Sequence, residues 1–296
     1  MAIKKWAELT MTGARHREIT FRYVAERYLR EVLPMKAPRT QRDNLHELEQ
    51  LFKFFDDPPA PLDDIEPLNV RQYLDWRKAA KVRANREKAL FSHIWNFARN
   101  VGLTTKANPC AGIKGYKETG RDTYVDDAVF LAVWTAAEEH LRDALDLAYL
   151  TGQRPADVLK LSRDDIKDGA LIVRQNKTGK LLRIAIEGQL ADVVARISAK
   201  YAKSRRLLAM PNGDPVSEGS LKGAFGRARS TAIAAHPDLA ERIREFQFRD
   251  LRAKAGTDKE ESGGLDAAKD QLGHASALMT AHYVRHRKGK LVKPTK

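Results

Sequence analysis

The chain has 296 residues, enough for about two domains of ordinary size, and its 43% hydrophobic and 31% charged residues exclude a chain that is disordered throughout. Lys and Arg outnumber Asp and Glu by 53 to 39, and the resulting net charge of +14 favours a polyanion as the partner. No run approaches the roughly 18 apolar residues of a membrane span, so we expect a soluble protein with no membrane partner.

The first part of the chain is predicted to be helical after a basic lead-in. Residues 1–19 are basic and lack sustained apolar periodicity, which predicts a mobile lead-in. They contain no signal-peptide core, so we expect a protein that is not exported. Residues 20–107 are predicted to form one helical domain. Apolar residues at helical spacing predict two helices within residues 20–55, and four of the chain's 12 prolines make residues 56–67 an extended connection.

Two more helices are expected in this domain, over residues 69–78 and 85–101. The second has Leu90, Ile94 and Phe97 on one face. A basic run of the kind found here is usually a solvated helix face, but the charge of the whole chain favours contacts to phosphate groups. The basic residues before and along this helix are Arg77, Lys78, Lys81, Arg83, Arg86 and Lys88.

The composition changes between residues 108 and 121. This stretch is rich in Gly, Pro and Lys, as interdomain linkers are, and it contains Cys110. A single cysteine excludes an intramolecular disulfide and a multi-thiolate zinc site, fits a reducing compartment and is best interpreted as a small buried hydrophobe. We predict a linker over residues 108–121, a second domain over residues 122–286 and a basic tail over residues 287–296.

The second domain is predicted to combine helices with a β-hairpin. Helices are expected over residues 126–139 and 141–150. Alternating apolar residues predict strands over residues 170–173 and 181–186, and the Thr-Gly pair of RQNKTGK supplies the turn between them. The remainder returns to helical signals. The predicted fold is therefore mainly α, with a small antiparallel β-hairpin or sheet.

The segment LTGQRPADVLKL contains the first candidate anion site. Pro155 suits the first position of a helix, which makes Arg154 the N-cap residue beside free backbone amides. Asp157 falls in the first turn, where the helix dipole stabilises a carboxylate, and it could hold the guanidinium group of Arg154. Taken alone, a surface arginine with a capping acid is the more ordinary interpretation.

A second basic cluster lies in FRDLR. Arg249 and Arg252 are three residues apart, which predicts that they share one helix face. Like charges at that spacing repel each other, so an anion held between them explains the pair. Two solvated arginines are the alternative.

The hairpin and the C-terminal region supply three more candidates. Lys177 lies in the tip of the predicted hairpin, where most lysines are merely solvated. His274 directly follows Gly273, a residue type that commonly ends a helix. Tyr283 is expected on a second helix after that stop.

In this order, the segments TGQRPADVLKL, KTGK, FRDLR and LGHASALMTAHY resemble the tyrosine recombinases, the phage-integrase family of DNA strand-exchange enzymes. The resemblance covers residues 126–287. It implies that the helical domain is a DNA-binding core-binding domain and that the second domain is the α+β catalytic domain. The implied site residues are Arg154 as the first family arginine, Asp157 as its accompanying acid, Lys177 as the hairpin lysine, Arg252 as the second arginine, His274 as the late histidine and Tyr283 as the nucleophile.

One position departs from the family's pattern. Where most members have a histidine three residues before the second arginine, this chain has Arg249. A guanidinium group can donate hydrogen bonds to a phosphate, but its pKa above about 12 prevents it from acting as a base near neutral pH. The sequence therefore leaves open how Tyr283 loses its proton.

The chemistry of phosphodiester exchange explains these residue types. Attack on phosphorus concentrates negative charge on the nonbridging oxygens, which donors on Arg154 and Arg252 would stabilise. His274 and Arg249 are expected as further donors. A tyrosine hydroxyl, with a reference pKa of about 10, needs a cationic surrounding or a base to become a nucleophile, and Lys177 would protonate the departing 5′ oxygen. The product is a 3′-phosphotyrosyl link that a 5′-hydroxyl reverses, so no metal, ATP or other cofactor is expected.

The resemblance also implies the setting of the reaction. It predicts a site-specific integrase of a mobile element, bacterial or phage-encoded, that acts in the cytoplasm at the nucleoid. A homotetramer would bind double-stranded DNA attachment sites, with accessory DNA-bending or directionality proteins as further partners. The basic segment after Tyr283 is expected to pass to a neighbouring protomer.

Other functions remain open at this point. The chain could be a DNA-binding protein of the same fold that has lost catalysis, with Arg249 as the first symptom, or a DNA-relaxing enzyme of the type IB topoisomerase kind. A metal site is disfavoured: His282 and His286 are spaced to share a helix face, but Arg285 and Arg287 surround them. It lacks a third ligand nearby.

Overall fold

The computed structural model describes residues 19–201 and 204–284. The chain divides into two compact units, Met1–Gly120 and Arg121–Lys296. The expectations for the basic lead-in before residue 19, for the tail over residues 287–296 and for His286 lie outside the described residues.

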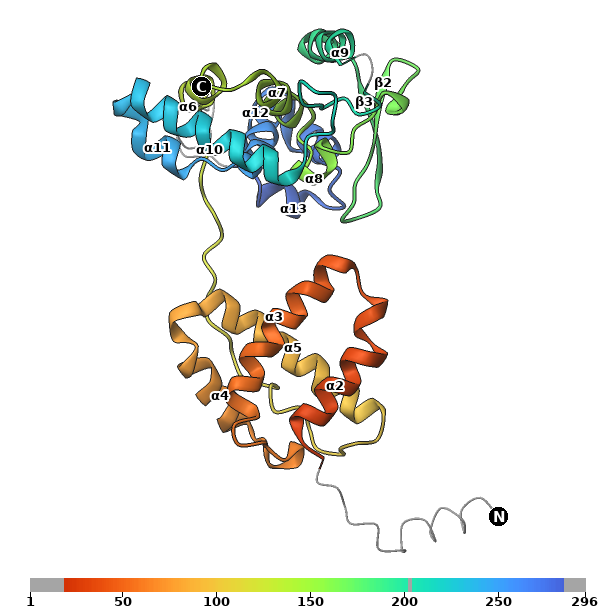
Figure 1. Cartoon of the computed structure of the whole chain (residues 1–296), viewed down its shortest axis with the longest axis vertical. Coiled ribbons are helices and arrows are strands. Elements are labelled where there is room, and N and C mark those ends of the chain that lie inside the picture. Colours follow the sequence, from red (N-terminus) through yellow and green to blue (C-terminus); the bar gives the residue numbers. More distant parts are fainter. Residues whose placement is uncertain (1–18, 202–203, 285–296) are drawn as a thin grey trace, which may run out of the picture. The chain divides into compact units, whose positions relative to one another are not determined.

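From residue 19 on, the first unit contains four α-helices (Figure 1) and three short 3-10 turns. Thr20 caps the first helix because its side chain accepts a hydrogen bond from the backbone N–H of Tyr23. Pro38 and Pro67 occupy the first turns of two later helices, where a missing N–H costs nothing. The elements are α2 (Phe21–Glu31), η1 (Leu33–Met35), α3 (Pro38–Phe55), η2 (Leu62–Asp64), α4 (Pro67–Trp76), η3 (Lys78–Ala80) and α5 (Lys81–Asn100).

Aromatic side chains form the core of this unit. Phe21 stacks on Phe91 with ring centroids 5.0 Å apart, and Phe55 lies 4.9 Å from the same ring. Cys110 is buried in this core, as expected of a small hydrophobe. Part of the stretch expected to be a linker therefore packs on the first unit, and the side chain of Asn85 also bonds to the backbone of Tyr116.

The second unit is mainly helical with one small sheet. The strands pair antiparallel in the order β1-β2-β3, and Leu171 lies opposite Ile184 in the register of the hairpin. The elements are α6 (Asp127–Thr135), α7 (Glu139–Thr151), α8 (Pro155–Val158), η4 (Arg163–Asp165), β1 (Ile166–Lys167), β2 (Ala170–Arg174), β3 (Leu181–Ala185), α9 (Gly188–Lys200), α10 (Glu218–Ala235), η5 (Pro237–Leu239), α11 (Ala240–Glu245), η6 (Phe248–Asp250), α12 (Leu251–Leu272) and α13 (Ala277–Ala281).

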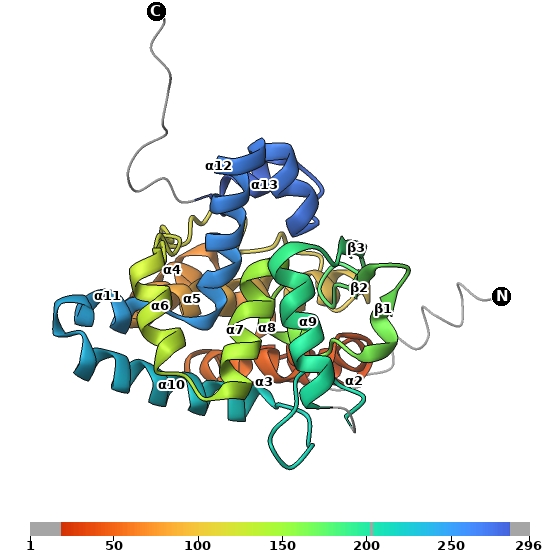
Figure 2. The ribbon, with the colours of Figure 1, turned by 90° about the horizontal axis from the view of Figure 1, so that it is seen from above.

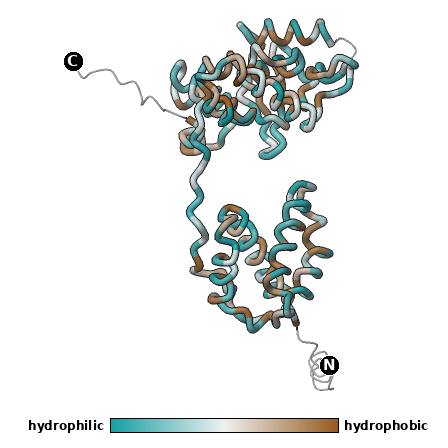
Figure 3. The backbone as a smooth tube through the Cα atoms, turned by 60° about the vertical axis from the view of Figure 1, so that its left-hand side comes forward, coloured by the Kyte–Doolittle hydropathy of each residue, from teal (hydrophilic) through white to brown (hydrophobic). Residues whose placement is uncertain are grey.

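These elements confirm the predicted fold class. Strand β1 was not predicted, because its two residues are too short to show an apolar alternation. Helix α7 buries Leu141, Leu145 and Ala148 at helical spacing, and hydrophobic stretches alternate with hydrophilic ones along the helices of both units (Figure 3). No helix in residues 19–201 and 204–284 has the length and apolar character of a membrane span.

Helix α12 organises the second unit. It packs against α7, and the short α13 lies beside its C-terminal end (Figure 2). Gly152 caps the C-terminus of α7 and Gly273 that of α12, both with left-handed backbone conformations, φ +66° and +67°. The predicted stop at Gly273 is confirmed, and these two ends bring the segments that follow them together.

Two separate ion pairs, each with one buried partner, hold the start of α12. Arg121 donates two 2.7 Å hydrogen bonds to the carboxylate of Asp250. The side chain of Lys254 is buried and its ammonium group lies 2.9 Å from Asp258, which also accepts a 2.7 Å hydrogen bond from the hydroxyl of Tyr149. Burial and the Asp258 carboxylate both raise the pKa of Tyr149. The end of α7 and the start of α12 are therefore fixed against each other.

Candidate active site

Arg154 is the N-cap residue of α8, and Pro155 is the first helical residue, as the sequence predicts. The expected anion site at free backbone amides is not what the structure contains. Helix α8 has only four residues, and the N–H groups of Asp157 and Val158 donate to the carbonyl of Arg154 at 2.8 and 2.9 Å. A single turn has little dipole, which leaves the guanidinium group of Arg154 as the main positive charge at this position.

Asp157 is buried and anchors the hairpin more directly than it holds Arg154. Its Oδ1 accepts a 2.8 Å hydrogen bond from the backbone N–H of Asn176. Its Oδ2 lies 3.9 Å from Nη1 of Arg154, at the outer limit of an ion pair. Among the described residues, no carboxylate therefore forms a short hydrogen bond with the guanidinium group of Arg154.

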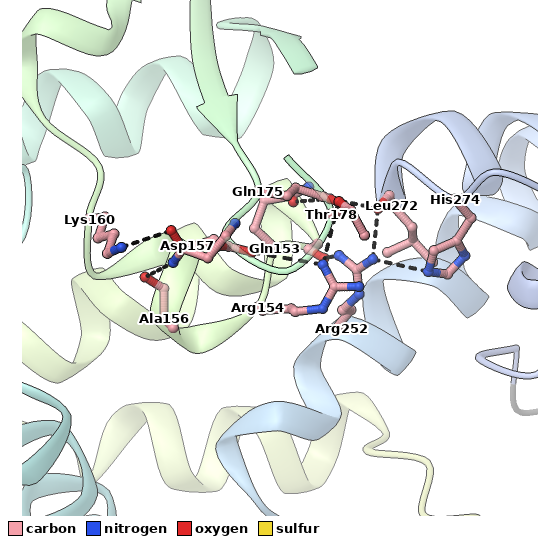
Figure 4. Close-up of polar contacts among 12 residues, drawn as sticks. Gln153, Arg154, Ala156, Asp157, Lys160, Gln175, Thr178, Arg252, Leu272 and His274 are labelled. Atoms are coloured by element: carbon pink, nitrogen blue, oxygen red, sulfur yellow. Dashed lines mark hydrogen bonds and ion pairs between the residues drawn. The ribbon is translucent and has the colours of Figure 1, made fainter. Parts of the chain in front are cut away.

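Arg252 lies at the centre of the cluster, with only 3% of its surface exposed. Its Nη1 donates to the carbonyl of Gly152 and its Nη2 to the carbonyl of Leu272, each at 2.7 Å, and Figure 4 shows its guanidinium group next to that of Arg154. Burial and the charge of Arg154 lower the pKa of Arg252 to about 10, so it is still charged at neutral pH. Two adjacent cations, one of them buried, favour binding of an anion between or beside them.

His274 is buried against Arg252, and its hydrogen bonds define its tautomer. Nη2 of Arg252 can only donate, so Nε2 of His274, 3.0 Å away, must accept. Nδ1 then carries the proton and donates to Oγ1 of Thr280 at 3.0 Å. The hydroxyl of Thr280 in turn donates to the carbonyl of Ser276, which leaves its oxygen free to accept. In this arrangement His274 orients the guanidinium group of Arg252.

The protonation of His274 provides a test of this arrangement. Burial, followed by the charges of Arg252 and Arg154, lowers the pKa of His274 from the ordinary 6.5 to about 4. The unfolded chain therefore binds more protons than the folded chain between these pH values. The resulting stabilisation is complete above pH 6.5 and is lost as the pH falls toward 4, by up to about 3 kcal/mol.

We expect an NMR titration of the imidazole ring of His274 to have its midpoint near pH 4. The resonance is assigned from its absence in a His274→Gln sample. A midpoint at or above pH 6 contradicts the burial of a neutral ring beside two arginines.

Tyr283 lies beside Arg252 and His274. Its ring centroid is 4.9 Å from that of His274, and Cζ of Arg252 is 5.4 Å from it. The expectation that Tyr283 is on a helix is wrong, because α13 ends at Ala281. Tyr283 lies in the turn that follows, and its backbone N–H donates to the carbonyl of Thr280. The short helix and this turn direct the ring back onto the end of α12.

Lys177 and Arg249 are the two predicted site residues that the structure does not bring into contact with this cluster. Lys177 is exposed in the turn between β2 and β3. Arg249 is exposed on the 3-10 turn η6, whereas Arg252 is buried in α12. The expected shared helix face is therefore wrong, because the α-helix begins only at Leu251 and a different helical turn precedes it.

Residues 127–290 match the family model described as the phage integrase family. The chain belongs to this family, the tyrosine recombinases. The chain is 30% identical over 244 residues to the integrases of Enterobacteria phage 434 and Escherichia phage lambda, and each match covers 76% of this chain. It spans 65% of the length of these curated relatives.

Solved integrase structures have the same fold. A lambda integrase tetramer bound to a Holliday junction matches with a TM-score of 0.81 at 22% identity, over 94% of this chain and 81% of that one. A lambda integrase dimer bound to a COC′ core site matches with a TM-score of 0.80 at 22% identity, over 100% and 88%. The Tn1549 transposon integrase in complex with transposon right end DNA matches with a TM-score of 0.72 at 15% identity, over 90% and 95%.

Sequence reasoning missed two glutamines in this integrase-family site. Gln153 and Gln175 are each only 1% exposed, and they bond to each other through Nε2 of Gln175 and Oε1 of Gln153 at 2.8 Å. The only sequence signal for these two residues was their position: Gln153 directly precedes Arg154, and Gln175 lies two residues before Lys177. A glutamine beside a turn is usually solvated, so its burial could not be read from the pattern.

No group of three or more His, Cys, Asp or Glu side chains in the described part of the chain is arranged to hold a metal ion. The groups beside Tyr283 are the guanidinium group of Arg252, next to which Arg154 lies, and the imidazole of His274, which accepts a hydrogen bond from Arg252. Paired guanidinium groups suit the planar, bidentate recognition of a phosphate group.

Proposed function

We propose that this chain is a site-specific DNA recombinase that cuts and rejoins DNA through a 3′-phosphotyrosyl intermediate. The observation that carries the proposal is the placement of the Tyr283 ring against a buried arginine, Arg252, whose neighbour Arg154 adds a second charge. A phosphodiester is the anion that such a site fits best, because the net charge of +14 favours a polyanion and a tyrosine is the adjacent nucleophile.

The proposed reaction assigns each step to a side chain. Arg154 and Arg252 donate hydrogen bonds to the nonbridging oxygens and stabilise the charge that develops on them. The phenol of Tyr283 releases its proton to water, its oxygen attacks phosphorus and the bond to the 5′ oxygen breaks. That oxygen takes a proton from Lys177, which regains one from solvent. Attack by a 5′-hydroxyl on the phosphotyrosine reverses these bonds, so the exchange conserves bond energy and needs neither ATP nor metal.

Asp157, His274 and Arg249 support this reaction in different ways. Asp157 fixes the hairpin turn through Asn176, and His274 orients Arg252. Arg249 is a donor for the DNA backbone and not a base, because a guanidinium group does not release its proton near neutral pH.

The proposed partners follow from the relatives. The lambda integrase structures contain a tetramer on a Holliday junction and a dimer on a core site. By analogy, this chain would act as a homotetramer on double-stranded attachment sites of a mobile element, at the nucleoid in the cytoplasm, with accessory DNA-bending or directionality proteins.

The test uses nicked suicide duplexes cut from the DNA that flanks the gene of this protein. With EDTA present and ATP absent, we expect a covalent protein–DNA adduct that survives SDS, because a short strand released beyond the nick cannot return to reverse the cleavage. Binding without any adduct would support the catalytically impaired alternative. Relaxation of any supercoiled plasmid, regardless of its sequence, would support the topoisomerase alternative.

A further inference from the structure

The side chain of Gln175 is buried where strand β2 passes into the hairpin turn. Its Oε1 accepts hydrogen bonds from Oγ1 of Thr178 at 2.9 Å and from Nη1 of Arg154 at 3.4 Å. Its Nε2 donates to Oε1 of Gln153 at 2.8 Å and to the carbonyl of Leu272 at 2.9 Å (Figure 4). Both donors and both acceptor positions of the carboxamide are therefore used.

These contacts connect Gln175 to both arginines of the site. It bonds to Arg154 directly. It reaches Arg252 through the carbonyl of Leu272, which accepts from Nε2 of Gln175 and, at 2.7 Å, from Nη2 of Arg252. One glutamine thus bridges the N-cap of α8 and the C-terminal end of α12.

The same residue also closes the turn that carries Lys177. The backbone N–H of Gln175 donates to the carbonyl of Lys180 at 2.9 Å, and the N–H of Gly179 donates to the carbonyl of Gln175 at 2.8 Å. Thr178, next to Lys177, bonds to the Gln175 side chain. The Gln175 side chain therefore attaches the turn to the arginine pair, in addition to the bond between Asn176 and Asp157.

The chemistry of this position requires an amide. Oε1 faces donors on Arg154 and Thr178, whereas Nε2 faces the acceptor carbonyl of Leu272, so only one orientation of the carboxamide fits. The packing is also close: a Cβ added at Gly273 would lie 2.9 Å from Nε2 of Gln175. A glutamate has no donor for Leu272, and a methionine has neither donor nor acceptor of comparable strength.

We propose that Gln175 is a positioning residue that holds the Lys177 hairpin against Arg154 and Arg252. This inference rests on the proposed function. The two arginines and Lys177 must contact the same phosphodiester. A displacement of Lys177 by about 1 Å can therefore reduce the cleavage rate about 100-fold. DNA affinity comes from many phosphate contacts and depends little on this one link.

The kinetic test compares Gln175→Met and Gln175→Glu in the full chain, under single-turnover conditions on the suicide duplex. We expect the cleavage rate constant to fall about 10- to 100-fold in both, with the DNA dissociation constant within about twofold of the native value. Gln189→Met is the matched control, because Gln189 is an exposed glutamine on α9. A native rate constant in Gln175→Met would mean that the residue only fills space, and it would overturn the proposal.

A double-mutant cycle tests whether Gln175 acts through the hairpin. In a Lys177→Ala background, Gln175→Met is expected to lose most of its effect, because the group that it positions is already absent. An undiminished loss in that background would contradict positioning of the lysine.

A second measurement does not depend on cleavage. Hydrogen–deuterium exchange of the full chain without DNA is expected to be faster across residues 174–182 in Gln175→Met and unchanged in Gln189→Met. Unchanged exchange in Gln175→Met would overturn the inference. If the native chain forms no adduct, the proposed function fails, while this exchange experiment still decides whether Gln175 holds the hairpin.

Discussion

Replacing Tyr283 by phenylalanine is expected to abolish the covalent protein–DNA adduct and to leave DNA affinity within about twofold of the native value. Phenylalanine keeps the ring that lies 4.9 Å from His274 and 5.4 Å from Cζ of Arg252, so the packing of the site is retained. Only the attacking oxygen is lost. The cleavage rate should fall by about 1,000-fold or more, since a missing nucleophile has no substitute at that place.

The measurement is an SDS gel of the suicide duplex beside a gel-shift titration. Tyr201→Phe is the matched control, because it removes a tyrosine hydroxyl from the same unit, where that group bonds to Asp143 at 3.3 Å. The control protein should form the native amount of adduct. An adduct formed by Tyr283→Phe would show that another residue attacks the phosphate.

Replacing Arg252 by alanine should lower the cleavage rate by about 100- to 1,000-fold or more. The change removes the buried cation next to Tyr283 and also the donor that His274 accepts from. Arg252→Lys should be intermediate in rate, because a single ammonium group cannot reach the two carbonyls and the imidazole that the planar guanidinium group holds together.

The rate constant must be compared among folded molecules. Alanine leaves the carbonyls of Gly152 and Leu272 without this donor, which also destabilises the unit, so melting curves accompany the single-turnover rates. Arg205→Ala is the matched control, since it removes an equal charge from an exposed pair with Asp164. A near-native rate for Arg252→Ala would refute charge stabilisation by this residue.

Local signals predicted a large part of the fold. Pro155 placed the start of α8 and Gly273 placed the end of α12, because each residue type has a backbone preference that acts within one turn. The helix predicted over residues 141–150 corresponds to most of α7, Glu139–Thr151. The two-residue strand β1 and the 3-10 turn before Leu251 carried no comparable signal.

Only part of the candidate site could be predicted from the sequence. The sequence identified Arg154, Arg252, His274 and Tyr283, and the structure places them in one cluster. It did not reveal Gln175, because the burial of a glutamine depends on three elements that meet only in the folded chain.

The sequence by itself determined the mainly helical class, the family and the order of the residues proposed for catalysis, since motifs and spacing are properties of the chain. The tertiary structure alone decided that Arg252 is buried while Arg249 is exposed, and that His274 accepts from Arg252. Burial, charge proximity and the direction of a hydrogen bond arise between segments that are distant in sequence. Such properties have no local signature, because the partners that define them are set by the packing of α7, the hairpin and α12.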